Sequence, residues 1–205
     1  MVSYFKKDIF FSKKWIVIVL LYCLIVGFVF VKDGGESFYF VEFLFPFFAV
    51  YFPLSKILSM EDSRDTRDFL RRMPQRAYGR IIARILYIIV LLTLSFAVKI
   101  FYKQLLIENY TILLGINIEK EVAFFCGFLA YFLIELIVFY KTSYHMAQNS
   151  GLFAFAIAIV IGLILKYTNI NINLLANISA MRIILIGLGV NLALIYGVIV
   201  AEKSS

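Results

Sequence analysis

The sequence predicts an all-α integral membrane protein with about six transmembrane helices, built as a single transmembrane domain over residues 1–205. Hydrophobic residues make up 63% of the chain, against roughly 45–50% in ordinary soluble proteins. A helix needs about 20 apolar residues to cross a bilayer core about 30 Å thick. Lipid admits only helices and closed barrels, and no run alternates like a barrel strand. The apolar runs are residues 15–31, 37–55, 85–98, 122–140, 142–165 and 183–201.

The distribution of basic residues predicts that both termini lie in the cytoplasm and that the protein lies in the cell membrane. With the N-terminus inside, the inner side carries 14 of the 20 Lys and Arg residues and the outer side carries six. Cytoplasmic loops of membrane proteins carry such an excess of positive charge. This bias, together with attraction to anionic lipid headgroups, accounts for the net charge of +7. The charge therefore does not indicate a nucleic-acid partner.

The first element, residues 1–14, is expected to be a short helix lying in the inner membrane interface. Phe5, Ile9 and Phe10 can share one side of this helix, and four lysines flank that side. An apolar side bordered by lysines is typical of helices that lie in a membrane surface. A flexible basic tail is the alternative interpretation.

The second and third runs flank a strongly charged segment. Pro46 and Pro53 lie in the second run, and each removes a backbone donor and favours a kink. The third run, residues 85–98, is short for a membrane span. We expect Arg80 and Arg84 to extend it, because a long basic side chain can lie along apolar surface while its charge reaches water.

Residues 59–84 carry 11 of the 33 charges of the chain and cannot lie in lipid, so we expect the first cytoplasmic loop here. Ser59 with Asp62 matches the capping pattern of a helix N-terminus. Acidic residues fill the first turns and arginines the last, which complements the helix dipole. Pro74 disfavours helix at the residue before it. The pattern predicts a helix over residues 60–73, whose small apolar tip consists of Phe69, Leu70 and Met73.

This arrangement resembles the membrane subunits of ABC type-two exporters, which have six spans, an interfacial N-terminal helix and a charged first cytoplasmic loop. In that loop, acidic residues precede a Leu-x-x-(Leu/Met)-Pro-x-Arg pattern. With 205 residues, the chain is similar to the small permeases that export phenol-soluble modulins or protect against peptide antibiotics. It departs from the family at Asp68 and Phe69. Its loop between spans five and six is short, which leaves open whether the chain has the outer re-entrant helices of the family. The matching residues are Glu61, Asp62, Leu70, Met73, Pro74 and Arg76.

The resemblance implies a division of labour with a separate ATPase subunit. This chain would be a non-catalytic permease that forms the path for amphipathic peptides or other hydrophobic cargo. ATP and Mg²⁺ would bind the ATPase, and this chain would hold no cofactor or metal. Its other partners would be a second permease chain, identical or not, and membrane lipids. Residues 59–80 would be the coupling segment, and the ATPase would contact Glu61, Asp62, Arg64, Asp65, Arg67, Asp68, Phe69, Leu70, Arg71, Arg72, Met73 and Pro74.

Two acidic residues inside the apolar runs are candidate substrate-path residues. A lone carboxylate is costly in lipid, so Glu135 could line a cavity, pair with an arginine or bind a proton, and Glu42 could reach water. An intramembrane enzyme or proton-coupled carrier that uses Glu135 or His145 is therefore an alternative function. A membrane scaffold without transport is another, and residues 59–84 could be a solvated loop that only follows the positive-inside rule.

Overall fold

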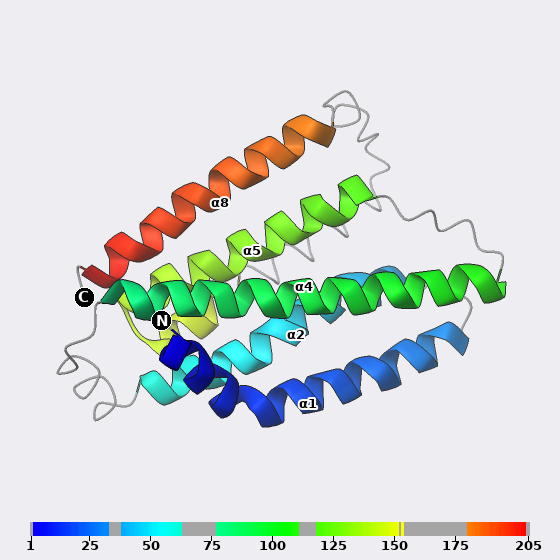
Figure 1. Ribbon diagram of the computed structural model, residues 1–205, viewed down its shortest axis with the longest axis horizontal. Helices are drawn as coiled ribbons and strands as arrows, with labels where there is room; N and C mark the ends of the chain where they lie inside the picture. The colour runs from blue at the N-terminus through cyan, green and yellow to red at the C-terminus, as the bar shows by residue number, and fades with distance from the viewer. Residues whose placement is uncertain are drawn as a thin grey trace. The chain divides into compact units, whose positions relative to one another are not determined.

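The computed structural model describes residues 2–32, 38–62, 77–110, 118–151, 153 and 180–203. These residues form helices and short connections, which confirms the all-α prediction for the part of the chain that is described. A short helical stretch covers residues 144–151. The long helices in Figure 1 are α1 (Val2–Lys32), α2 (Phe38–Glu61), α4 (Ala77–Tyr110), α5 (Ile118–Lys141) and α8 (Ala180–Lys203).

Three stretches of these helices are long and apolar enough to cross a membrane, namely Gly79–Phe101, Glu121–Lys141 and Leu185–Glu202. The third predicted run, which is short in sequence, belongs to a helix of 34 residues, because α4 continues well beyond the run at both ends. The first and second runs lie within α1 and α2. The count of six spans and the location of the termini stay predictions.

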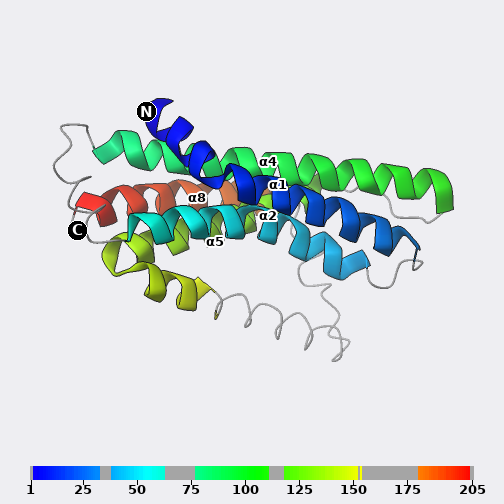
Figure 2. The same ribbon diagram turned by 90° about the horizontal axis from the view of Figure 1, so that it is seen from below.

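The chain divides into two compact units, Met1–Glu121 and Val122–Ser205. In the first unit α1, α2 and α4 pack against one another, and Figures 1 and 2 show them running alongside each other. Most of the side chains at their contact are apolar. Close packing of buried apolar side chains holds helices together in soluble and in membrane proteins. The fully buried residues of this core include Val50, Leu54 and Leu58 of α2 and Ile88 and Leu92 of α4.

A buried ion pair helps to hold the first unit together in the C-terminal half of α4. Lys99 of α4 donates to Glu121 Oε2 of α5 at 2.6 Å, and both side chains are buried. The Lys99 ammonium also lies 4.9 Å from the centre of the Phe96 ring, within the range of a cation–π contact. The pair ties α4 to the first turn of α5.

The N-terminal residues are helical and continuous with the first apolar run, since α1 is unbroken from Val2 to Lys32. Figure 1 shows a change of direction in its first part. The buried face consists of Tyr4, Asp8 and Ser12, spaced four residues apart, whereas Phe10 is 63% exposed. Residues four apart share a helix face, so the face turned inward is largely polar. The location of this part in the membrane interface stays a prediction.

The helix predicted to begin after Ser59 does not begin there, because α2 continues through this position to Glu61. The Ser59 hydroxyl donates to the Lys56 carbonyl at 2.8 Å, as serines inside helices do, and the Asp62 N–H donates to the Leu58 carbonyl at 3.0 Å. The prediction of Ser59 as an N-cap is therefore wrong. Residues 63–76 lie outside the described residues, and the remainder of the predicted helix over 60–73 is untested.

In the second unit, α5 ends at Lys141 and the chain turns at once into residues 144–151. Ser143 accepts a hydrogen bond from the Met146 N–H at 3.5 Å, the geometry of an N-cap. His145 therefore lies in the first turn of a helix, where its side chain is exposed.

The helices α5 and α8 approach each other closely at Gly187. A Cβ built on Gly187 would lie 3.1 Å from the Cβ of Cys126. One turn on, Asn191 Nδ2 donates to the Cys126 carbonyl at 3.1 Å and to the Gly187 carbonyl at 2.8 Å. Small residues and interhelical hydrogen bonds of this kind are typical of helix contacts in membranes.

Candidate functional site

Four charged side chains from three helices meet inside the first unit, and we refer to Lys7, Asp8, Glu61 and Arg84 as the charge cluster. Lys7 and Asp8 come from the start of α1, Glu61 is the last residue of α2, and Arg84 lies in the second turn of α4. Asp8, Glu61 and Arg84 are all buried, and Arg84 is completely enclosed, with 0% of its surface exposed. Charges are almost never fully buried unless they are paired, so the arrangement of partners decides what this site can do.

Arg84 is the centre of the cluster. Its Nη1 donates to Glu61 Oε2 at 2.9 Å and its Nη2 donates to Glu61 Oε1 at 2.8 Å. Two parallel bonds of this length between a guanidinium and a carboxylate form the strong bidentate geometry. Longer bonds run from Arg84 Nε and Nη2 to the Asp8 carboxylate, at 3.5 and 3.4 Å. One arginine thus holds the end of α2 and the start of α1 together.

Lys7 completes the cluster and balances its charge. Its ammonium donates to Glu61 Oε1 at 2.7 Å and lies 3.8 Å from Asp8 Oδ1. Two cations therefore face two carboxylates. Burial alone would raise the pKa of Glu61, but the charges and hydrogen bonds of Arg84 and Lys7 outweigh burial and lower that pKa from 4.5 to about 2. Glu61 is thus ionised at neutral pH, as a stable pair with Arg84 requires.

Hydroxyl groups extend the cluster along α1 and α4. The Tyr87 hydroxyl donates to Ser12 Oγ at 2.6 Å, and Ser12 Oγ donates to the backbone carbonyl of Asp8 at 2.6 Å. The Phe5 ring packs edge-on against the Tyr87 ring, with 6.4 Å between their centres. Arg84 and Tyr87 lie three residues apart and so share one face of α4. The contact between α1 and α4 is therefore polar at its centre and aromatic beside it.

The structure corrects the role expected for Arg84. Its side chain, expected to reach water, is enclosed and bonded to two carboxylates. Arg80, one turn earlier, is partly exposed. Sequence reasoning also missed Asp8, which lies within a run of lysines and phenylalanines. The four-residue spacing of Tyr4, Asp8 and Ser12 could have indicated that the buried face of this helix is polar. The expected face was the apolar one that carries Phe5, Ile9 and Phe10.

The cluster joins the helices on the two sides of residues 62–76. Glu61 immediately precedes the charged loop and Arg84 follows it, and these two residues are bonded to each other. The two ends of residues 62–76 are therefore fixed to one point, and α1 is bonded to the same point through Asp8.

The other predicted site residues fall in several places. Of the docking residues, Glu61 is buried in the charge cluster and Asp62 is partly exposed, while those from Arg64 to Pro74 lie outside the described residues. Glu42 lies within α2, but its side chain is outside the described set. Glu135 is buried in α5, in the second unit.

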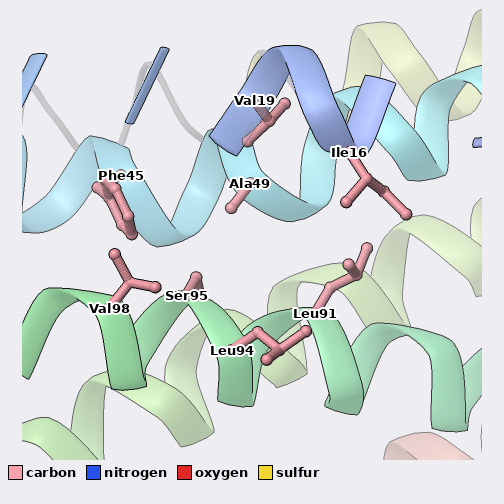
Figure 3. A pocket seen from close by; sticks show the side chains of 8 residues that line it. All are labelled: Ile16, Val19, Phe45, Ala49, Leu91, Leu94, Ser95 and Val98. Atoms are coloured by element: carbon pink, nitrogen blue, oxygen red, sulfur yellow. The ribbon is translucent and has the colours of Figure 1, made fainter. Parts of the chain in front are cut away.

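An apolar hollow of about 40 Å³ lies between the three helices of the first unit. Figure 3 shows that residues of α1 and α2 line it on one side and residues of α4 on the other. Ser95 contributes the one hydroxyl, which donates to the Leu92 carbonyl. Pockets for small molecules occupy about 300–1,000 Å³, so this hollow does not accommodate a peptide in the described state. It is lined by Ile16, Val19, Phe45, Ala49, Leu91, Leu94, Ser95 and Val98.

A family model matches almost the whole chain. The model of the family described as "ABC-2 family transporter protein" matches residues 4–200. No curated protein matches the chain, and no solved structure matches it.

Proposed function

The chain belongs to the ABC-2 family of transporter proteins, and we propose that it is the permease subunit of an ATP-driven exporter in the cell membrane. Membrane-spanning helices and the family together support a membrane permease. In the proposed exporter, a separate ATPase subunit binds ATP and Mg²⁺, and this chain performs no chemistry itself. Two permease chains, identical or different, form the path between them, and both termini of each chain lie in the cytoplasm.

The charge cluster is the observation that carries the proposal of coupling to the ATPase. It fixes both ends of residues 62–76 to α1, α2 and α4. A loop that only follows the positive-inside rule needs no such anchor, whereas a loop that receives force from a partner does. Glu61 belongs to the anchor, so the docking surface that we propose begins one residue later. It consists of Asp62, Arg64, Asp65, Arg67, Asp68, Phe69, Leu70, Arg71, Arg72, Met73 and Pro74.

Within this surface, Phe69 and Leu70 would bury their side chains in the ATPase, and the arginines and aspartates around them would orient the contact. Aromatic and aliphatic anchors supply most of the binding energy of such interfaces, and charges at the rim supply orientation and rate. The proposed cargo is an amphipathic peptide or another hydrophobic molecule, as in the exporters of phenol-soluble modulins and peptide antibiotics that the chain resembles.

The proposal is tested by placing charge at the apolar tip of the docking surface. In the double variant F69D/L70D, two carboxylates would enter a site that binding must desolvate, so co-purification with the ATPase should fall at least tenfold. Membrane insertion should be unchanged. The measurement is the ratio of ATPase to permease after affinity purification from membranes.

The matched control is F10D/F11D, which introduces the same two charges at an adjacent pair of exposed aromatic residues in α1. This control should retain the ATPase. Full retention of the ATPase by F69D/L70D would refute the docking surface, and loss of the ATPase in both variants would show that added charge alone disrupts the complex.

A further inference from the structure

One carboxyl group of the second unit has no counterion among the residues that the structure describes. Glu135 lies inside the apolar stretch Glu121–Lys141 and is 2% exposed. Its Oε2 is enclosed and has no hydrogen-bond partner among the described residues. None of the ion pairs between described residues includes it. In this respect it differs from Glu61 and Glu121, each of which has a cation within 3 Å.

The described residues beside this carboxyl group are uncharged. Among the described residues, Gly151 of the stretch 144–151 approaches this carboxyl group, and Tyr131, one turn before Glu135 on α5, lies beside the same glycine. A Cβ built on Gly151 would lie 3.7 Å from Glu135 Cδ and 2.7 Å from the Tyr131 hydroxyl oxygen. A separation of 2.7 Å is shorter than real Cβ contacts, so only glycine fits without movement. The carboxyl therefore lies against bare backbone, and neither facing residue is charged at neutral pH.

An ionised carboxylate in this position would be very unfavourable. Moving an isolated charge into an apolar interior is opposed so strongly that the group neutralises instead, and ionisable groups within membrane spans are rare unless they are paired or functional. Three ligands could remove the penalty: a metal or organic cation, a basic side chain of another molecule, or a proton. A cation or a basic side chain would need room between α5 and the stretch 144–151, whereas a proton adds almost no volume beside Gly151, so a proton is the ligand that fits this approach of the two helices.

We propose that Glu135 is a proton-binding site, and that it is a neutral carboxylic acid at neutral pH when α5 packs against residues 144–151. Loss of the proton would place a charge against the Gly151 backbone, so deprotonation and separation of the two helices are linked. This site adds proton binding to the proposed export function.

The test is infrared spectroscopy of the full-length chain in lipid nanodiscs, with E135Q as the comparison. At neutral pH the wild type should show the C=O stretch of a protonated carboxylic acid, and E135Q should lack that band. The matched control is E121Q. Glu121 is paired with Lys99 and is therefore expected to be ionised, so its removal should leave the carboxylic-acid band equal to that of the wild type. Absence of a band specific to Glu135 at neutral pH would overturn the proposal.

A second measurement keeps the test decisive if E135Q does not fold. An apolar carbodiimide reacts with protonated carboxyl groups in membranes, and mass spectrometry can locate the adduct in the wild-type chain. We expect modification of Glu135 at neutral pH, decreasing as the pH is raised, and no modification of Glu121. Modification of other carboxyl groups with Glu135 left intact would contradict the proposal.

Discussion

At the scale of single residues, Arg84 determines how the first unit is held together. Replacing a complete buried ion cluster by apolar residues is often neutral, but removing one partner from it is strongly destabilising. Arg84 contributes bonds to both carboxylates of the cluster. Its removal therefore leaves two buried carboxylates with Lys7 as their one remaining cation within the cluster.

We expect R84M to lower the stability of the purified chain by about 3 kcal/mol, the lower end of the range for breaking a buried pair. The measurement is the unfolding midpoint in detergent. K6M removes the same charge from an exposed position one residue before the cluster, and it should leave the midpoint almost unchanged. Equal midpoints for R84M and the wild type would show that the cluster does not contribute to stability.

The depressed pKa of Glu61 predicts how this stability depends on pH. A carboxyl whose pKa is lowered in the folded protein stabilises the fold above its ordinary value of 4.5, and that contribution is lost as the pH falls toward about 2. The difference in unfolding midpoint between wild type and E61Q should thus be constant above pH 4.5 and shrink below it. A difference that grows on acidification would contradict the assignment.

At the scale of helices, the sequence sufficed to predict the all-α class and the approximate positions of the long helices, because apolar runs of membrane length indicate helices directly. It did not predict the charge cluster, since Arg84 contacts residues 76 and 23 positions away. Such pairing depends on which helix faces turn toward each other, and local patterns do not contain that information. Ser59 was misassigned for a related reason: the capping pattern matched, but α2 continued through it. The docking residues from Arg64 to Pro74 stay a prediction.

A second prediction at this scale concerns the contact between α4 and α5. K99M should destabilise the chain, because Glu121 would remain buried without its cation. The double variant K99M/E121L should recover much of the loss, since an apolar pair of similar size often replaces a buried ion pair without penalty. The unfolding midpoints of K99M, E121L and K99M/E121L, compared with that of the wild type, form a double-mutant cycle. Additive losses would show that the two side chains do not interact.

At the scale of the whole molecule, the proposed function separates docking of the ATPase from transmission of force to the helices. In R84M the proposed docking surface is unchanged, so the ATPase should still co-purify, but Glu61 and α1 lose their bonds to Arg84. We expect ATP-dependent export in proteoliposomes to fall at least tenfold while ATPase binding changes less than twofold. F69D/L70D should lose both. Normal export by a folded R84M exporter would show that force reaches the helices by another path.

The cluster also determines the order in which the chain can be assembled during synthesis. Chains are made from the N-terminus, so Lys7 and Asp8 leave the ribosome first, Glu61 follows 54 residues after Lys7, and Arg84 follows 76 residues after Asp8. Until Arg84 appears, one lysine faces two carboxylates. The start of α1 therefore has to stay accessible at the site of insertion while α2 and the charged loop are made, and the first unit closes only when α4 arrives.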